Sequence, residues 1–348
     1  METIWFCLIA LMLAMYVVLD GFDLGAGIIH LGVARTDGER RAVLASIGPV
    51  WDGNEVWLIA AGGTLYFAFP ALYAAAFSGF YLPLMIVLWL LILRGCAIEF
   101  RNHMESPVWT PFWDAVFAGA SALLAVFFGA ALGNLVRGVP LDATGYFFEP
   151  LWTNFRLGPN AGILDWYTIL VGLAAYFALT QHGALWVAYR TTGELRRRAR
   201  RAARWGWVGA VVFTACVTAA TFAIQPQVLH NFSSYPWGYF FPLLAIGGLA
   251  GAMALLRRED SDRGAFIASC AYLTGMLTSV VFGLYPYVLP ASTNPEFSLT
   301  VHNAKAADYG LRIGLVWWVI GIALVAGYFV FLYHFSAGRI PLEPDDHA

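Results

Sequence analysis

The sequence predicts an all-α protein: a polytopic membrane helical bundle of nine transmembrane helices, arranged as two four-helix units plus one peripheral helix. Hydrophobic residues make up 60% of the 348 and charged residues 12%, whereas soluble domains carry about 25% charged residues. Nine apolar windows also reach the length of about 20 residues that a span needs. They cover approximately residues 4–29, 50–69, 72–98, 112–136, 163–187, 205–224, 238–256, 264–284 and 311–333.

An internal repeat underlies the division into two units. RTDGER at residues 35–40 recurs as RTTGEL at residues 190–195, an offset of 155 residues. The same offset brings the second window onto the sixth and the fourth close to the eighth, while the third matches the seventh less well. Because each unit holds four spans, both copies keep the same orientation. The predicted organisation is a first four-helix repeat (1–136), a periplasmic connection (137–161), a second four-helix repeat (162–290), and a ninth helix with a cytoplasmic tail (291–348).

The distribution of basic residues predicts the orientation. Of the 20 Lys and Arg residues, 16 lie at the ends of odd-numbered windows or in the segments that follow them. Cytoplasmic loops carry the excess of positive charge, so we expect a periplasmic N-terminus and a cytoplasmic C-terminus. The start, METIW, contains no basic residue and precedes no cleavage site, which favours a retained first helix over a signal peptide. Seven arginines between residues 190 and 204 are expected to contact anionic lipid headgroups.

Two acidic motifs stand at the predicted cytoplasmic ends of the first two windows. DGFD (20–23) contains Asp20 and Asp23, and WDGNEVW (51–57) contains Asp52 and Glu55. Residues three apart on a helix lie on one side of it. An ionisable residue in a membrane costs about 2.5–3.5 kcal/mol near the centre and usually has a function. We therefore expect these four carboxyl groups to line a route for proton uptake from the cytoplasm.

A structural role for the acids is the competing interpretation. Asp52 follows Pro49 near a predicted helix start, where aspartate caps backbone N–H groups. Asp20 and Asp23 lie toward the C-terminal end of their helix, where the dipole opposes carboxylates. The repeat offset pairs Asp52 with Trp207, so the acidic cluster belongs to the first repeat alone. In the same region, a GxxxG pattern at residues 21–25 predicts close approach of a neighbouring helix.

The sequence offers poor ligands for a haem or a metal. Haem needs His or Met at mid-span depth, but His30 and His182 lie toward the ends of their spans, and the other histidines fall in loops, at a span end or in the tail. We expect this chain to bind no metal and no haem of its own, and His182 to bond a backbone carbonyl. The sequence contains no phosphate loop, catalytic triad or dinucleotide fingerprint, and no nucleic-acid partner is expected.

Two other classes of function stay open at this point. A proton-coupled secondary transporter would use Asp20, Asp23 and Asp52 to couple protons to a solute. Transporters tend to break helices near the midplane in both halves, whereas these acids cluster near one face. A purely structural assembly subunit is the second alternative.

Several motifs occur together over nearly the full length. They are DGFDLGAG (20–27), RTDGERR (35–41), WDGNEVWL (51–58), YAAAFSGFY (73–81), LRGCAIEFR (93–101), GNLVRGVP (133–140) and RTTGEL (190–195). In combination they resemble subunit II of the cytochrome bd family of quinol oxidases. Glu55 and the EFR ending are similar to the cyanide-insensitive branch of that family.

The resemblance implies a haem-free subunit of a respiratory-chain oxidoreductase in the bacterial cytoplasmic (inner) membrane. In this family the partner, subunit I, carries haems b and d and oxidises quinol. The electrogenic complex reduces dioxygen to water during aerobic respiration, with proton uptake from the cytoplasm. The family's proposed proton route implies roles for Asp52 and nearby Asp23. A small single-span accessory subunit, membrane lipids and, in some members, a structural quinone also belong to the complex. No catalytic residue is expected in this chain.

Overall fold

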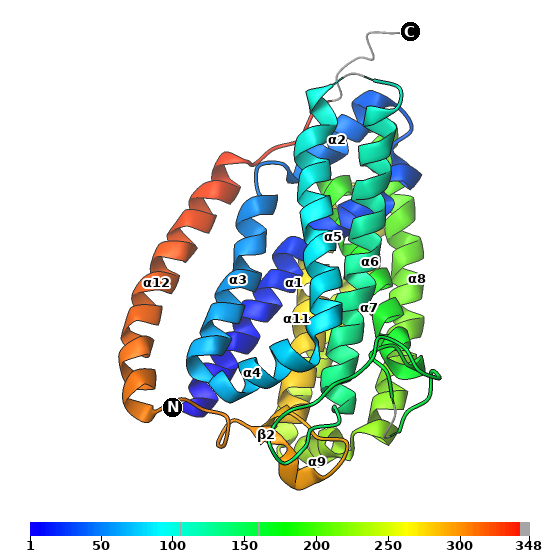
Figure 1. The fold of residues 1–348 in the computed structure, drawn as a ribbon. Helices are drawn as coiled ribbons and strands as arrows, with labels where there is room; N and C mark the ends of the chain where they lie inside the picture. Colours follow the sequence, from blue (N-terminus) through cyan, green and yellow to red (C-terminus); the bar gives the residue numbers. More distant parts are fainter. Residues whose placement is uncertain (105, 159–160, 342–348) are drawn as a thin grey trace.

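A computed structural model describes residues 1–104, 106–158 and 161–341, and this part of the chain forms a bundle of long helices (Figure 1). The helices are α1 (Glu2–Val33), α2 (Asp37–Ile47), α3 (Trp51–Ala68), α4 (Pro70–Gly79), α5 (Tyr81–Phe100), α6 (Trp109–Arg137), α7 (Trp166–Arg190), α8 (Gly193–Ile224), α9 (Pro226–Ser234), α10 (Phe240–Leu256), α11 (Asp262–Leu284) and α12 (Asp308–Phe335). Short 3₁₀ helices are η1 (Arg101–His103), η2 (Pro236–Tyr239) and η3 (Pro295–Phe297), and β1 (Tyr287–Leu289) pairs antiparallel with β2 (Leu299–Thr300).

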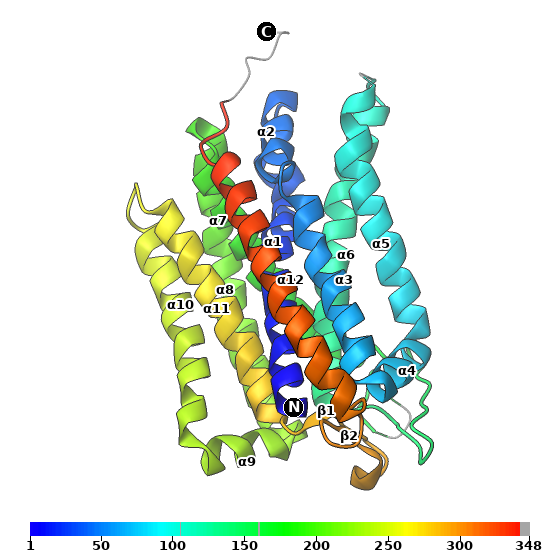
Figure 2. The same ribbon diagram turned by 90° about the vertical axis from the view of Figure 1, so that its left-hand side faces the viewer.

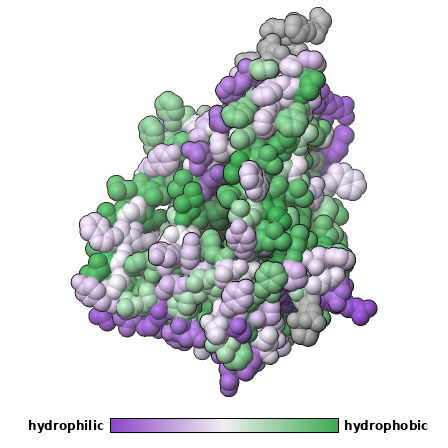
Figure 3. Space-filling view, in the orientation of Figure 1, coloured by the Kyte–Doolittle hydropathy of each residue, from purple (hydrophilic) through white to green (hydrophobic). Residues whose placement is uncertain are grey.

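Eight of the described helices are long and apolar enough to cross a membrane, namely α1, α5, α6, α7, α8, α10, α11 and α12. A helix satisfies its backbone hydrogen bonds internally, which the interior of a bilayer requires. Hydrophobic residues cover the middle of the visible face, and hydrophilic residues gather toward its two ends (Figure 3). The prediction of an all-helical, multi-pass membrane protein is therefore confirmed. α3 also lies along α1 (Figures 1 and 2), but its acidic residues lower its mean hydropathy.

The third predicted span begins too early. The apolar window at residues 72–98 suggested one helix, but the structure divides this region into α4, which crosses the end of the bundle, and α5, which starts at Tyr81 (Figure 1). Phe80 separates them with non-helical torsion angles, φ −94° and ψ 23°. Pro83 has no N–H to donate to the preceding turn. Hydrophobicity alone could not separate a short helix across the bundle end from the span that follows it.

Helix α1 lies at the centre of the bundle and packs against α3, α6, α7 and α11. Its contact with α7 requires glycine on both helices. A methyl carbon on Gly25 would lie 2.0 Å from the carbonyl oxygen of Leu179, and one on Gly183 would lie 2.2 Å from the carbonyl carbon of Gly25. The close helix approach predicted from GxxxG is present, and it brings α1 backbone to backbone with the first helix of the second half of the chain.

The end of the bundle opposite α2 is closed by the segment between α6 and α7. Arg137, the last residue of α6, donates to Glu149 Oε1 at 2.6 Å and to the carbonyl oxygen of Gly162 at 3.1 Å, and it also bonds Asp165. Asp165 in turn caps α7 by accepting from the N–H groups of its first turn. One guanidinium thus fastens the connecting segment to the end of one helix and the start of the next.

Glu149 is the buried acid of this contact, and its hydrogen bonding is incomplete. Its side chain is 2% exposed and its Oε2 has no hydrogen-bond partner among the described residues. Burial raises the pKa of Glu149 from its ordinary value of 4.5 to about 7, the carboxylate of Asp165 adds to the rise, and Arg137 opposes it. The folded protein therefore keeps a proton on Glu149 between about pH 4.5 and 7, where the unfolded chain has released it.

Stability should consequently fall as the pH rises from 4.5 through 7 and level off above 7, because the folded state binds more protons in that window. The loss attributable to Glu149 should reach at most about 3 kcal/mol. Thermal unfolding of the purified protein at pH 5.5 and 8, for wild type and Glu149→Gln, measures it. Glu149→Gln should be much less sensitive to pH, while the control Glu296→Gln, at an exposed position, should behave as wild type. An equal pH response of wild type and Glu149→Gln would contradict the assignment.

Candidate functional site

Asp20 and Asp23 of α1 have no exposed surface. They lie one helical turn apart, and each faces a different neighbouring helix. Asp20 meets a residue of α5, and Asp23 meets a residue of α3. The two acids predicted to share a side of α1 therefore line one buried region between α1, α3 and α5.

Arg94 of α5 is the cation of this region. Its Nη1 donates to Asp20 Oδ2 at 3.0 Å and its Nη2 to Asp20 Oδ1 at 2.7 Å. The same Nη2 also bonds Glu55 of α3. Arg94 and Asp20 have no exposed side-chain surface, whereas Glu55 is 25% exposed. Two-pronged contacts between arginine and a carboxylate are among the strongest hydrogen bonds in proteins, and this one joins the two acidic motifs through a third helix.

Within the described part of the chain, Asp23 has no cation as a hydrogen-bond partner. Its Oδ2 accepts from Asn54 Nδ2 at 2.8 Å, and its Oδ1 has no partner among the described residues. Asn54 Oδ1 accepts from the hydroxyl of Tyr333 at 2.9 Å, which connects α12 to the same network. A buried carboxyl held only by a neutral amide is a poor place for a full negative charge.

The cluster holds more acids than cations. Asp20, Asp23 and Glu55 share one cation: Arg94 bonds Asp20 and Glu55, while Asp23 lies one helical turn from Asp20 and bonds Asn54. If all three were ionised, two negative charges would stay uncompensated in a region of low dielectric constant, which is costly. The arrangement is therefore suited to hold at least one exchangeable proton.

Asp52 is placed differently from the other three acids. It is exposed on α3 and makes no hydrogen bond or ion pair with the described residues. The capping role considered for it is wrong, because Val50 is the N-cap residue of α3 and no side chain caps this helix. Asp52 lies one turn before Glu55, so it adjoins the buried cluster from the outer side of α3.

A second buried ion cluster lies nearer the α2 end. His30 Nε2 lies 2.7 Å from Asp114 Oδ1 of α6, and Arg101 Nε donates to the same oxygen at 2.6 Å. Arg40 of α2 donates to Asp114 Oδ2 at 3.0 Å. Asp114 is 1% exposed. This carboxylate thus joins α1, α2 and α6 to the end of α5, and it fixes α2 over the acidic motifs.

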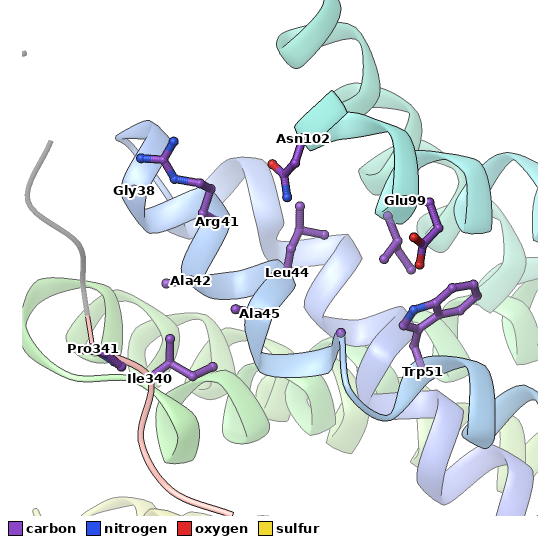
Figure 4. Close-up of a pocket in the computed structure, with 12 residues that line it drawn as sticks. Gly38, Arg41, Ala42, Leu44, Ala45, Trp51, Glu99, Asn102, Ile340 and Pro341 are labelled. Atoms are coloured by element: carbon purple, nitrogen blue, oxygen red, sulfur yellow. The ribbon is translucent and has the colours of Figure 1, made fainter. Parts of the chain in front are cut away.

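A pocket of about 520 Å³ opens beside this end of the bundle (Figure 4). Residues of α2 form one side of it, and Trp51 at the start of α3 lies on another. Figure 4 shows Glu99 of α5 next to Trp51, with Arg41 on the α2 side. Since Trp51 immediately precedes Asp52 in the sequence, the pocket leads from the surface to the first turn of α3.

His30 of α1 and His182 of α7 are both engaged by the protein. His182 Nε2 lies 2.8 Å from the carbonyl oxygen of Val18, and its Nδ1 lies 2.7 Å from Ser269 Oγ. The predicted bond from His182 to a backbone carbonyl is therefore confirmed. His30 is held by Asp114. No group of three or more His, Cys, Asp or Glu side chains suited to a metal occurs within residues 1–104, 106–158 and 161–341.

Residues 1–336 match the cytochrome bd terminal oxidase subunit II family. The chain belongs to this family. It is similar to cytochrome bd-I ubiquinol oxidase subunit 2 of Escherichia coli strain K12, with 32% identity covering 98% of this chain and 95% of the relative. It is also similar to cytochrome bd ubiquinol oxidase subunit 2 of Bacillus subtilis strain 168, with 30% identity covering 98% of this chain and 97% of the relative. The resemblance carried by the sequence motifs is confirmed.

A solved structure has the same fold as this subunit II chain. The bd oxidase from Geobacillus thermodenitrificans contains a chain that matches with a TM-score of 0.74 and 18% identity, over 96% of this chain and 98% of that chain. At this level of identity the match supports the fold and leaves the roles of individual residues to the geometry.

The sequence reasoning missed three members of the buried network. Arg94 and Asn54 contact the predicted acids and Tyr333 contacts Asn54, but none of the three was assigned to the site. A signal existed for Arg94, because an arginine inside an apolar run needs an acidic partner. No local signal existed for Tyr333, which reaches Asn54 from a helix 279 residues further along the chain.

Arg94→Gln should destabilise this subunit II chain strongly. The substitution leaves the buried Asp20 and the partly exposed Glu55 without their cation, and breaking a buried ion pair in this way costs about 3–5 kcal/mol. The yield of folded protein from membranes and its thermal unfolding midpoint should both fall. The exposed Arg156→Gln serves as a charge-matched control and should change neither. Adding Asp20→Asn to Arg94→Gln should recover part of the loss, and an unaltered midpoint in Arg94→Gln alone would refute the role assigned to the pair.

Proposed function

We propose that this chain is the haem-free subunit II of a cytochrome bd-type quinol:dioxygen oxidoreductase in the bacterial inner membrane. Membership of the subunit II family supports the assignment, as do relatives named ubiquinol oxidase subunit 2. The haem-bearing subunit I would carry out quinol oxidation and the reduction of dioxygen to water. This chain would support subunit I and supply part of the path by which protons enter.

Nine transmembrane helices in two units follow from the same proposal, with α3 as the ninth. Its 18 residues span about 27 Å at 1.5 Å per residue, close to the thickness of the hydrocarbon core. The repeat at residues 1–136 and 162–290 is supported by α4 and α9. Each is a short helix that begins with proline and directly follows the second long helix of its unit. The excess of basic residues at the α2 end favours a cytoplasmic position for that end.

The main support for the proposed proton route is the composition of the buried cluster of Asp20, Asp23, Glu55 and Arg94. Three carboxyl groups share the one cation Arg94, and Asp23 bonds no cation among the described residues, so the cluster is suited to exchange a proton. Glu55 is the partly exposed member, and Asp52 stands one turn nearer the pocket at the α2 end. We infer the order pocket, Asp52, Glu55, and then the buried pair Asp20 and Asp23.

The chemistry along this path is simple proton transfer between oxygen atoms. A proton that arrives from the cytoplasm is accepted by an exposed carboxylate at the mouth and passed inward. Arg94 compensates the negative charge of Asp20 and Glu55, whereas Asp23 is held by the neutral amide of Asn54 and bonds no cation among the described residues. Acids that differ in this way can hold and release a proton in turn. The outward position of Asp52 suits a path completed by subunit I, which would cover that side of α3.

Asp52→Asn and Asp23→Asn should leave the complex assembled but lower its quinol-driven oxygen consumption by at least about tenfold, because proton transfer would lose a positioned carboxyl group. Assembly is measured by the haem spectrum of the purified complex, and turnover by an oxygen electrode. Asp142→Asn, in the exposed connection at the opposite end, is the matched control and should retain full activity.

Normal oxygen consumption by assembled Asp52→Asn or Asp23→Asn would remove that residue from the route. A tagged chain that copurifies with no haem-bearing partner would overturn the subunit assignment itself. Solute transport by that isolated chain would instead support the proton-coupled transporter.

A further inference from the structure

The arginines at the start of α8 fall into two groups, one bonded within the protein and one exposed on its surface. α8 is a single helix of 32 residues that runs from Gly193 to Ile224, so its basic segment is a rigid extension of a membrane span. The sequence suggested that all seven arginines between residues 190 and 204 face lipid headgroups. The structure divides them by direction, because some point into the protein and others point away from it.

The inward group holds neighbouring segments together. Arg196 Nε donates to Asp262 Oδ2 at 2.7 Å, and Arg200 bonds the same carboxylate and the carbonyl oxygen of Leu256. These contacts fasten the turn between α10 and α11 onto α8. Arg198 donates to the carbonyl oxygen of Val33 at 2.6 Å on the other side. These guanidinium groups are occupied by the fold, so they are unavailable for a ligand.

The outward group is free for a ligand. Arg201 and Arg204 are exposed and make no hydrogen bond or ion pair with any residue in the described part of the chain. Arg197, one turn earlier, pairs only with the exposed Glu194, a contact worth about 0–1 kcal/mol. Directly after them, Trp205 is 71% exposed and Val208 is 47% exposed. The helix surface thus changes from cationic to apolar within two turns.

The α10–α11 turn adds a second row of cations beside this surface. Arg257, Arg258 and Arg263 are exposed there and their side chains make no ion pair with the described residues. The acids of the same region, Glu194, Glu259 and Asp260, are exposed as well. With the three outward arginines of α8, six cations face three acids, and the patch keeps a net positive charge.

We propose that this outward patch, Arg197, Arg201 and Arg204 of α8 with Arg257 and Arg258 of the adjoining turn, binds the headgroup of an acidic phospholipid. A lipid is the fitting occupant because the exposed apolar surface of Trp205 and Val208 continues directly below the cations. Tryptophan favours the level of the headgroups, where Arg201 and Arg204 would then meet the phosphate. Arginine binds a phosphate through two donors at once.

The test uses the complete oxidase, purified with its partner subunit and placed in nanodiscs of phosphatidylcholine with a minority of phosphatidylglycerol. Native mass spectrometry then counts the phosphatidylglycerol molecules retained by each complex. Arg201→Gln/Arg204→Gln should bind phosphatidylglycerol at least about fivefold more weakly, since each basic residue near an anionic surface contributes about that factor. Raising the salt concentration should release this lipid from the wild-type complex in preference to phosphatidylcholine.

A matched control removes two exposed arginines from the opposite end, Arg156→Gln/Arg312→Gln, and should retain phosphatidylglycerol as the wild type does. Arg201→Lys/Arg204→Lys keeps the charge and should restore most of the binding. Equal retention by the α8 variant and the wild type, or equal loss in both glutamine pairs, would overturn the proposal. If the α8 glutamine pair does not assemble, the salt response of the wild type and the lysine pair decide the question.

Discussion

The contact between Arg94 and Asp20 is the interaction on which the interior of this protein depends. Neither side chain has exposed surface, and Glu55 joins them from a third helix. In a membrane interior, each of these charges alone would oppose insertion of the helix that carries it. Joined, they tie α1, α3 and α5 at one level and fix how each helix is rotated. The position of Asp23 beside Asn54 follows from that rotation, because both residues belong to helices already set by the arginine.

The positions of the long helices could be predicted from the sequence, because the thickness of a bilayer sets the length of a membrane-spanning helix. The apolar windows contain the cores of the long helices, and the errors occur where hydrophobicity says nothing about direction. α4 is as apolar as a span but lies across the bundle end, and α8 continues twelve residues before its apolar window as one helix. Both differences depend on local backbone restrictions and on contacts from other helices.

Only part of the candidate site could be predicted from the sequence. The spacing in DGFD and WDGNEVW indicates that each pair of acids lies toward one side of a helix. However, three residues turn a helix by about 300°, so the two side chains still point about 60° apart. That difference is enough to direct Glu55 toward Arg94 and leave Asp52 exposed. Which of two acids turns inward is decided by the neighbouring helices, and Arg94 and Tyr333 come from segments distant in the chain.

A comparison of the two proposed repeats indicates why charge is concentrated in the first. In the first unit His30 of α1 contacts Asp114 of α6, and in the second His182 of α7 contacts Ser269 of α11. Asp114 and Ser269 are 155 residues apart, the spacing that separates RTDGER from RTTGEL. His30 and His182 are 152 residues apart, so under the proposed repeat the second unit has a histidine contact between the corresponding two helices, at a position shifted by three residues and with a neutral partner. The first unit retains buried charges at an energetic cost that helix packing alone does not explain, and proton uptake provides a reason for that cost.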